Sequence, residues 1–317
     1  MILVTGASGF VGGALCASLV NRFPLRISVR DKSKTELFAN VDIFEASLSP
    51  DQDWSSTLSG VSAVVHCAAR VHVMSEEAAD PLFEFRRTNV DGTLNLARQA
   101  SEAGVRRFVF ISSIKVNGEC TDLGHPFAAD QIPVPSDPYG VSKYEAEMGL
   151  RTLSRETGME VVIIRSPLVY GPGVKANFLS MMNWLRRGIP LPLRSVTKNR
   201  RSFVFIDNLV SMIIACINHP AAANQTFLVS DDEDLSTAGL LDRMALALGC
   251  PSKLITVPTA LITLGAKLIG RSDISRRLCG SLQVDINKTK DFLGWSPPVS
   301  VDEGLRQTVA YFLKKQS

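Results

Sequence analysis

The sequence predicts an α/β protein in which helices cover both faces of a parallel sheet. Two observations support this class: short apolar runs alternate with helical patterns over the first half of the chain, and a glycine-rich loop joins the first run to the first helix. The chain has 317 residues, of which 45% are hydrophobic. It can therefore bury the core of one large domain or of two modest ones.

The first half of the chain supplies most of the predicted sheet. Short apolar runs predict strands at Ile2–Val4, Arg26–Arg30, Val41–Glu45, Ala63–Cys67, Phe108–Ile111 and Val161–Arg165. Helical periodicity lies between them, at Phe10–Val20, Leu82–Ala103 and Pro138–Thr157. Strands that alternate with helices in this way form right-handed crossovers in a parallel sheet.

The loop Thr5–Gly12 has the spacing G-x-x-G-x-x-G between a strand and a helix. Gly6 lets the chain turn, and Gly9 lets the backbone approach a pyrophosphate without a Cβ in the way. Gly12 lets the helix pack closely, and the helix N-terminus offers free N–H groups to the anion. The loop predicts dinucleotide binding and a doubly wound Rossmann sheet, whereas an ordinary β–α turn is the alternative.

After Arg165, prolines break the pattern. The later predicted elements are strands at Ser202–Phe205 and Phe227–Val229 and helices at Asn177–Arg187, Asp207–Asn218, Thr237–Leu248 and Val301–Lys314. We expect residues 1–165, completed by about 203–230, to form the dinucleotide-binding domain. Residues 166–202 and 231–317 should form a smaller, mixed α/β substrate lobe.

Composition excludes several classes of function. The net charge is +3, with no long basic run, so no nucleic-acid partner is expected. The six cysteines and four histidines are scattered, which indicates reduced thiols in the cytoplasm and no metal site. Because a strand starts at Ile2, no signal peptide is expected.

The apolar stretch Leu254–Ile269 is too short to span a bilayer, and Pro258 and Lys267 interrupt it. We therefore expect no integral membrane segment. A buried or lobe-packing helix is the favoured interpretation of this stretch, with peripheral membrane contact as the alternative.

Tyr139 and Lys143 stand four residues apart in a predicted helix, so both lie on one face. A nearby ammonium favours the phenolate, and this predicts a tyrosine that exchanges protons near neutral pH. The preceding strand ends in Ser112 and Ser113, and ligands of open α/β sheets bind beyond the carboxyl ends of strands. Hydroxyl, phenol and ammonium after one dinucleotide loop indicate a site for hydride transfer.

Further motifs extend along the chain at Thr5–Gly12, Val64–Ala69, Asn89–Thr93, Ser112–Ser113, Tyr139–Lys143, Tyr170–Gly173, Arg201–Asp207 and Leu293–Trp295. With these motifs the chain resembles the NAD-dependent epimerase/dehydratase family of extended short-chain dehydrogenases/reductases, which act on nucleotide sugars. The resemblance implies that the smaller lobe binds a nucleotide sugar, with a UDP-sugar as substrate. It also implies a homodimer, packed through Leu82–Ala103 and the helix that carries Tyr139.

The resemblance implies three catalytic residues. Ser113 would hydrogen-bond the reacting sugar oxygen, Tyr139 would be its acid and base, and Lys143 would hold the nicotinamide ribose. Implied cofactor contacts are Gly6, Ser8, Gly9, Phe10, Val11, Gly12, Arg30, Ala68, Ala69, Tyr139, Lys143 and Pro167. Implied substrate contacts are Ser113, Lys115, Asn177 and Arg201. Asn89 falls at the family's structural asparagine, and Lys115 is equally well explained as a satisfied surface lysine.

Arg30 follows the second strand, where NAD-preferring relatives usually carry an acid for the ribose 2′-hydroxyl. An arginine there suits a 2′-phosphate, so NADP(H) is the favoured cofactor. NAD stays open, because Asp31 could turn back to the ribose.

Departures from the family pattern narrow the predicted reaction. The stretch Ser113–Gly118 lacks the acid that family dehydratases carry after the catalytic hydroxyl, so 4,6-dehydration is not expected. Reduction of a UDP-4-keto-6-deoxy-hexose in surface-polysaccharide synthesis is favoured. A UDP-glucose or UDP-N-acetylglucosamine 4-epimerase with tightly bound NAD is the alternative. A dinucleotide-binding sensor without turnover is a third interpretation, which the intact Tyr139 and Lys143 disfavour.

Overall fold

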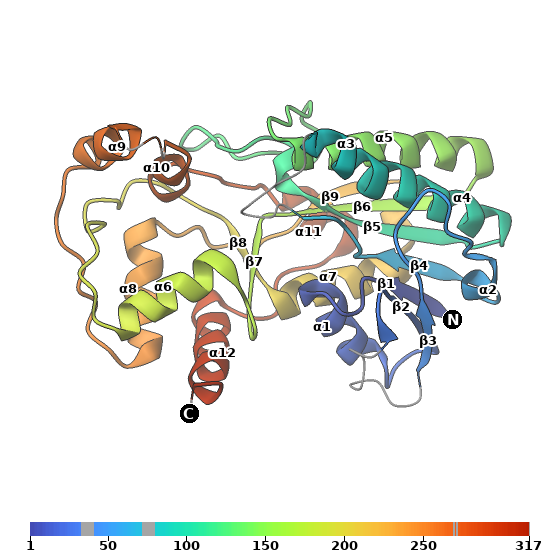
Figure 1. Cartoon of the computed structure of the whole chain (residues 1–317), viewed down its shortest axis with the longest axis horizontal. Coiled ribbons are helices and arrows are strands. Elements are labelled where there is room, and N and C mark those ends of the chain that lie inside the picture. The colour runs from blue at the N-terminus through green and yellow to red at the C-terminus, as the bar shows by residue number, and fades with distance from the viewer. Residues whose placement is uncertain (33–40, 72–79, 269, 271, 317) are drawn as a thin grey trace.

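A parallel sheet of seven strands forms the centre of the computed structural model, which describes residues 1–32, 41–71, 80–268, 270 and 272–316 (Figure 1). The strand order is β3-β2-β1-β4-β5-β6-β9, and all neighbouring pairs run parallel. The strands are β1 (Ile2–Thr5), β2 (Leu25–Val29), β3 (Asp42–Glu45), β4 (Ala63–His66), β5 (Arg107–Ser113), β6 (Glu160–Ser166) and β9 (Thr226–Leu228). Strand order reverses between β1 and β4, which is where such sheets bind ligands.

Helices cover both faces of this sheet (Figure 1). On one face of the sheet, Ile2 and Val4 of β1 pack with α1 (Phe10–Leu19) and α7 (Ile206–Asn218). On the other face, Leu3 packs with α4 (Thr93–Glu102) and α5 (Pro138–Thr157). Successive side chains of a strand point to opposite faces, so apolar runs are needed where both faces are covered. The predicted doubly wound fold is confirmed.

The helix predicted over Leu82–Ala103 is not one regular α-helix. It consists of α3 (Pro81–Phe85), a π-helical stretch η2 (Arg86–Gly92) and α4. Gly92 lies so close to the chain at Leu48 that a Cβ there would be 3.0 Å from the Leu48 carbonyl carbon. A π-helical stretch has a wider turn than an α-helix. The spacing of apolar residues in the sequence does not reveal this local change of helix type.

A second core lies beyond the sheet. There β7 (Leu168–Tyr170) pairs with β8 (Phe203–Phe205), and three helices pack around them: α6 (Ala176–Arg186), α8 (Thr237–Leu248) and α12 (Val301–Lys314). Sequence patterns missed β7, which has only three residues. The exact domain boundaries stay a prediction. The short elements are α2 (Ser55–Leu58), η3 (Ile114–Val116), η4 (Pro220–Ala222) and α11 (Asn287–Leu293).

The apolar stretch Leu254–Ile269 does not form a buried helix. Its helix is α9 (Thr259–Leu268), which has no buried residue and precedes α10 (Ser272–Cys279); Ile269 lies outside the described residues. Of the two favoured alternatives, the buried helix is wrong, while Ile262, which packs against the second core, agrees with a lobe-packing helix. Within the described residues, no helix has the length and apolarity needed to cross a membrane.

Candidate functional site

The loop between β1 and α1 is built for close approach. Gly6 has a φ of +71°, and a Cβ there would lie 2.7 Å from the Ala68 backbone nitrogen. At Gly12 a Cβ would overlap the Gly6 carbonyl oxygen, so α1 packs directly on the loop. Ser8 and Gly9 are exposed, and the Gly9 N-cap has no side chain to occupy the helix N-terminus. These features fit the pyrophosphate of a dinucleotide.

Most of the predicted cofactor residues lie at the carboxyl edge of the sheet, where neighbouring strand ends meet. Besides the loop with Phe10 and Val11, this edge carries Arg30 after β2, Ala68 and Ala69 after β4, Ser113 at the end of β5, and Pro167 after β6. The β5–β6 register sets Ser113 opposite Ser166. Arg30 is exposed and Pro167 is buried.

The first turn of α5 brings Tyr139 to this edge. Asp137 caps the helix by accepting a hydrogen bond from the Gly140 backbone nitrogen at 2.6 Å. Gly140 lies against the chain that follows Ser113, since a Cβ at Gly140 would be 2.8 Å from the Lys115 carbonyl oxygen. The first turn of α5 therefore packs on the segment that follows β5.

The surroundings of Tyr139 contradict one expectation. Burial and the negative charge of Asp137 raise the pKa of Tyr139 to about 12. Its ring packs edge-on against Phe85, with centroids 6.0 Å apart. Lys143 is not among the causes of this shift, so the predicted lowering of the Tyr139 pKa by Lys143 is not observed, and the Lys143 ammonium lies over the Phe110 ring.

Lys143 is buried, with 1% of its surface exposed. Its ammonium lies over the Phe110 ring, 3.9 Å from the centroid. Burial lowers the pKa of Lys143 to about 7, and Glu147 and Cys67 oppose that shift. A change of the Lys143 charge therefore falls in the physiological pH range.

Sequence reasoning missed a buried ion pair beneath the site. Glu147 accepts hydrogen bonds from Arg165 at 3.0 and 2.6 Å and from the Ser112 hydroxyl at 2.5 Å. Arg165 also donates to the Asn117 side-chain oxygen at 3.0 Å. This network joins α5, β5 and β6 directly behind Ser113. The signal available in the sequence was Glu147, an acid four residues after Lys143.

A second missed group is His66, at the end of β4. Its ring lies 2.6 Å from the Thr5 hydroxyl and 3.0 Å from the Thr93 hydroxyl, which ties β1 and β4 to α4. Burial and the charge of Lys143 lower the pKa of His66 to about 3, so the ring is neutral. His66 therefore acts as a structural bridge behind Lys143.

Asn89 belongs to the scaffold of the site. It is buried, and its amide accepts a hydrogen bond from the Arg70 backbone nitrogen at 2.8 Å and donates to the Arg70 carbonyl at 3.0 Å. It also donates to the Ser142 hydroxyl at 3.0 Å. These bonds hold the loop after β4 against α5, as the resemblance implies.

Lys115, predicted as a substrate contact or a satisfied surface lysine, is paired. Its ammonium forms ion pairs with Asp137 and, at 3.5 Å, with Glu119. About a third of its side chain remains exposed. The pairs favour the surface-lysine interpretation, because two carboxylates already neutralise this cation.

Arg201 and Asn177 lie in the segment 166–202, which the sequence predicts to belong to the substrate lobe. Arg201 is partly buried and donates to the Gly280 carbonyl at 3.2 Å. Burial and the nearby positive charge of Arg277 lower its pKa. An anion between these two guanidiniums would relieve their repulsion. Asn177 is exposed in the first turn of α6, and no described contact joins it to Arg201.

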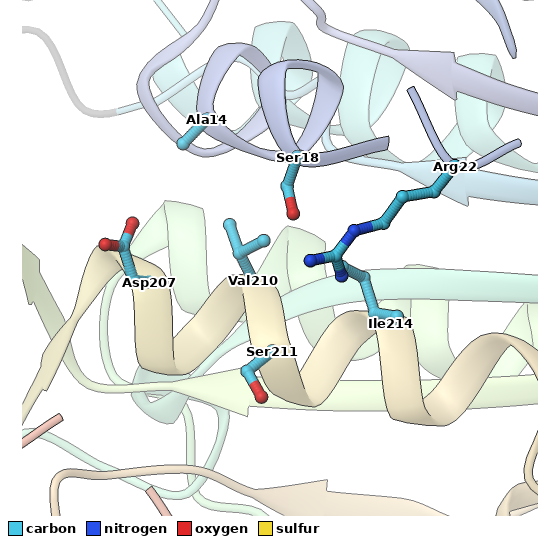
Figure 2. A pocket seen from close by; sticks show the side chains of 7 residues that line it. All are labelled: Ala14, Ser18, Arg22, Asp207, Val210, Ser211 and Ile214. Atoms are coloured by element: carbon cyan, nitrogen blue, oxygen red, sulfur yellow. The ribbon is translucent and has the colours of Figure 1, made fainter. Parts of the chain in front are cut away.

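A hollow of about 400 Å³ lies elsewhere, between α1 and α7 (Figure 2). Ser18 and Arg22 lie on one side of it, and Asp207, Val210 and Ile214 of α7 lie on the other. None of the predicted site residues lines it. Among the described residues, His, Cys, Asp and Glu side chains form no group of three or more that could hold a metal.

The fold and the site define an extended short-chain dehydrogenase/reductase. Residues 2–230 match the model of the NAD dependent epimerase/dehydratase family, and the chain belongs to this family. The chain is 49% identical to a UDP-glucose 4-epimerase of Vibrio cholerae over 317 residues, which cover 99% of this chain and 95% of the relative.

Solved structures share the fold. A UDP-glucose 4-epimerase of Thermotoga maritima with UDP-glucose superposes with a TM-score of 0.78 at 24% identity, covering 100% of this chain and 99% of that one. A UDP-glucuronic acid 4-epimerase of Bacillus cereus in complex with NAD gives 0.79 at 21% identity, covering 99% and 96%. At these identities the likeness concerns the fold.

Proposed function

We propose that the protein is a nucleotide-sugar 4-epimerase that acts on UDP-glucose or a close analogue. The observation that carries the proposal is the 49% identity with the Vibrio cholerae UDP-glucose 4-epimerase over nearly the whole of both chains. The sequence alone favoured a 4-reductase, but this relative favours the alternative reaction. The chain also has the three residues that the family resemblance implies as catalytic, namely Ser113, Tyr139 and Lys143.

NAD is the proposed cofactor, held by the Gly6–Gly12 loop. The Bacillus cereus structure contains NAD, and it gives no support to the NADP(H) preference inferred from Arg30. Arg30 is exposed and can turn to solvent. When bound, the nicotinamide ring supplies a hydride acceptor and, once reduced, a hydride donor, so epimerisation consumes no reducing equivalent.

The chain's own part in the reaction is to handle the proton at the C4 oxygen. The Tyr139 phenolate takes the proton of the C4 hydroxyl as hydride leaves C4, and the Ser113 hydroxyl donates a hydrogen bond to that oxygen. The 4-ketosugar would then rotate to present its other face, and Tyr139 would return the proton to the C4 oxygen when C4 is reduced on that face.

Lys143 would tune this exchange. A protonated Lys143 can hydrogen-bond the nicotinamide ribose and stabilise the Tyr139 phenolate through its charge. The pKa of Tyr139 is about 12 and that of Lys143 about 7. A Lys143 ammonium placed near the ribose and the phenol would lower the pKa of Tyr139 toward neutral pH.

The diphosphate of the substrate would lie between Arg201 and Arg277, with Asn177 as a further contact. The charge of Arg277 acts on Arg201, and the described residues give neither arginine an acidic partner, which suits a dianionic ligand. Replacing Arg201 with Met should abolish the rise in melting temperature that UDP causes, without lowering the melting temperature of the free protein. A lower melting temperature of the free variant would contradict this role.

A mixed substrate assay tests the function. Purified protein is incubated with UDP-glucose, UDP-N-acetylglucosamine or a UDP-4-keto-6-deoxy-hexose, each with and without NADPH. Epimerisation at C4 without net change in absorbance at 340 nm is expected with one of the first two. The dinucleotide released on denaturation should be NAD.

The 4-reductase remains the second candidate, because Arg30 stands where a 2′-phosphate would be held. Stoichiometric NADPH oxidation with the ketosugar, and none of the epimerised product, would replace the first proposal by this one. In that case Arg30→Ala should shift the preference from NADPH to NADH. The homodimer, the cytoplasmic location and the role in polysaccharide synthesis stay predictions.

A further inference from the structure

Helix α9 leaves an apolar surface uncovered at the end of the substrate lobe that lies far from β1–β3 (Figure 1). Leu261, Leu264 and Leu268 are 57%, 53% and 78% exposed. Their spacing of three and four residues puts them on one side of the helix, which we call the leucine face. Ile262 packs in the opposite direction, against the second core.

Nothing in the described chain covers the leucine face. A helix of ten residues is marginal by itself in water, and most helices gain their stability by burying an apolar side. In α9 that side faces outward. A contiguous exposed apolar patch of this kind marks a surface that binds something.

The sequence around the leucine face is mainly basic, since residues 253–279 contain five lysines and arginines and one acid, Asp273. Lys253 and Lys267 are exposed, and Arg276 is more than half exposed although it pairs with Glu119 at 3.4 Å. Leucines bordered by cations are typical of helices that lie in the interface of anionic membranes.

A second copy of the chain fits this surface less well. A two-fold contact would place the same surface on both sides, so Lys267 and its basic neighbours would face each other. Like charges across an interface oppose association. An anionic lipid surface instead satisfies both the leucines and the cations.

We propose that α9 docks the protein on an anionic membrane surface, with the leucine face inserted among the acyl chains near the headgroups. Lys267 and Arg276 lie at the level of the lipid phosphates. The contact is peripheral, since α9 has only ten residues. It holds the substrate lobe, and with it Arg277 on α10, close to the bilayer.

Vesicle co-sedimentation of the full chain tests the proposal. Vesicles of phosphatidylglycerol mixed with phosphatidylcholine are compared with vesicles of phosphatidylcholine alone, at low and high salt. We expect binding to the anionic vesicles that weakens with salt. The variant L261Q/L264Q/L268Q should bind at least about tenfold more weakly, since glutamine keeps the helix propensity and removes the apolar area. Lys267→Gln should weaken binding about fivefold.

The matched control is Leu246→Gln, which changes a leucine of α8 that is 81% exposed and lies outside the leucine face. It should bind vesicles like the unchanged protein. Thermal melts show whether each variant folds, and the single variant Leu268→Gln replaces the triple one if the latter melts early. The assay needs no turnover, so it is independent of the proposed reaction.

Two results would overturn the proposal. One is equal vesicle binding by the unchanged protein and the leucine variants, or no binding by either. The other is a dimer in sedimentation equilibrium that the leucine variant dissociates while lipid binding is absent. That second result would identify another copy of the chain as the occupant of the leucine face.

Discussion

Replacing Glu147 with Gln tests whether the buried ion pair holds the site together. The side chains of Glu147 and Arg165 are 1% and 3% exposed, and three hydrogen bonds end on the carboxylate. The variant leaves the Arg165 cation buried without its counter-charge. Breaking such a pair costs about 3–5 kcal/mol, a large part of a typical domain stability of about 5–15 kcal/mol.

Urea unfolding measures this loss. With a slope of about 3 kcal/mol per molar urea, the midpoint should fall by roughly 1–2 M. The matched control is Glu145→Gln, two residues earlier on α5, whose partner Arg86 lies at the surface. Its midpoint should stay within error, because exposed ion pairs contribute little.

A double variant separates a stranded charge from lost packing. Glu147→Gln combined with Arg165→Met removes the uncompensated cation and should recover more than half of the loss. If Glu147→Gln unfolds at the same urea concentration as Glu145→Gln, the pair does not hold α5 to β6 and the reasoning fails. The same outcome would also mean that the hydrogen bonds of Glu147 do not hold the neighbouring residues Ser113 and Lys143 in position.

Further predictions concern the residues of the candidate site. Lys143→Met should abolish turnover yet raise the melting temperature at pH 7, because the buried ammonium opposes folding. This gain in melting temperature should shrink as the pH rises from about 7 to 10.5. In that range Lys143 is already neutral in the folded protein, and the lysine of the unfolded chain loses its proton. Asp137→Asn should lower the pKa of Tyr139 and move the rise of the pH–rate profile to lower pH, and a shift to higher pH would disprove this coupling. Gly12→Ala should reduce NAD binding, measured by calorimetry, more than about tenfold, since the new Cβ meets the Gly6 carbonyl. The neighbouring Gly13→Ala, whose Cβ would stay 3.3 Å from the Ala7 carbonyl, should change binding far less.

Elements whose signals are local could be predicted closely from the sequence. The predicted bounds of α8 are those observed, because the Ser236 hydroxyl accepts from the Gly239 nitrogen at one end and Gly249 takes a φ of +67° at the other. The bounds of α12 also agree, with Ser300 as its cap. The order of apolar runs was enough to predict the parallel sheet.

Features that depend on distant partners could not be predicted. The three-residue strand β7 exists because β8, more than thirty residues later, pairs with it. The outward position of the α9 leucines follows from where the second core ends, which apolar content alone does not reveal. The pairing of Lys115 with Asp137 likewise depends on how α5 docks on η3.

The sequence by itself determined the class of this protein. Its glycine loop, Ser113 and the Tyr139–Lys143 pair mark a reductase-type site, because each requires particular residues at fixed spacing. The tertiary structure decided the electrostatics of that site. Burial beside Phe110 and Glu147 sets the charge of Lys143, and Asp137 raises the pKa of Tyr139. A pKa depends on desolvation and on charges from other segments, and only folding brings these together.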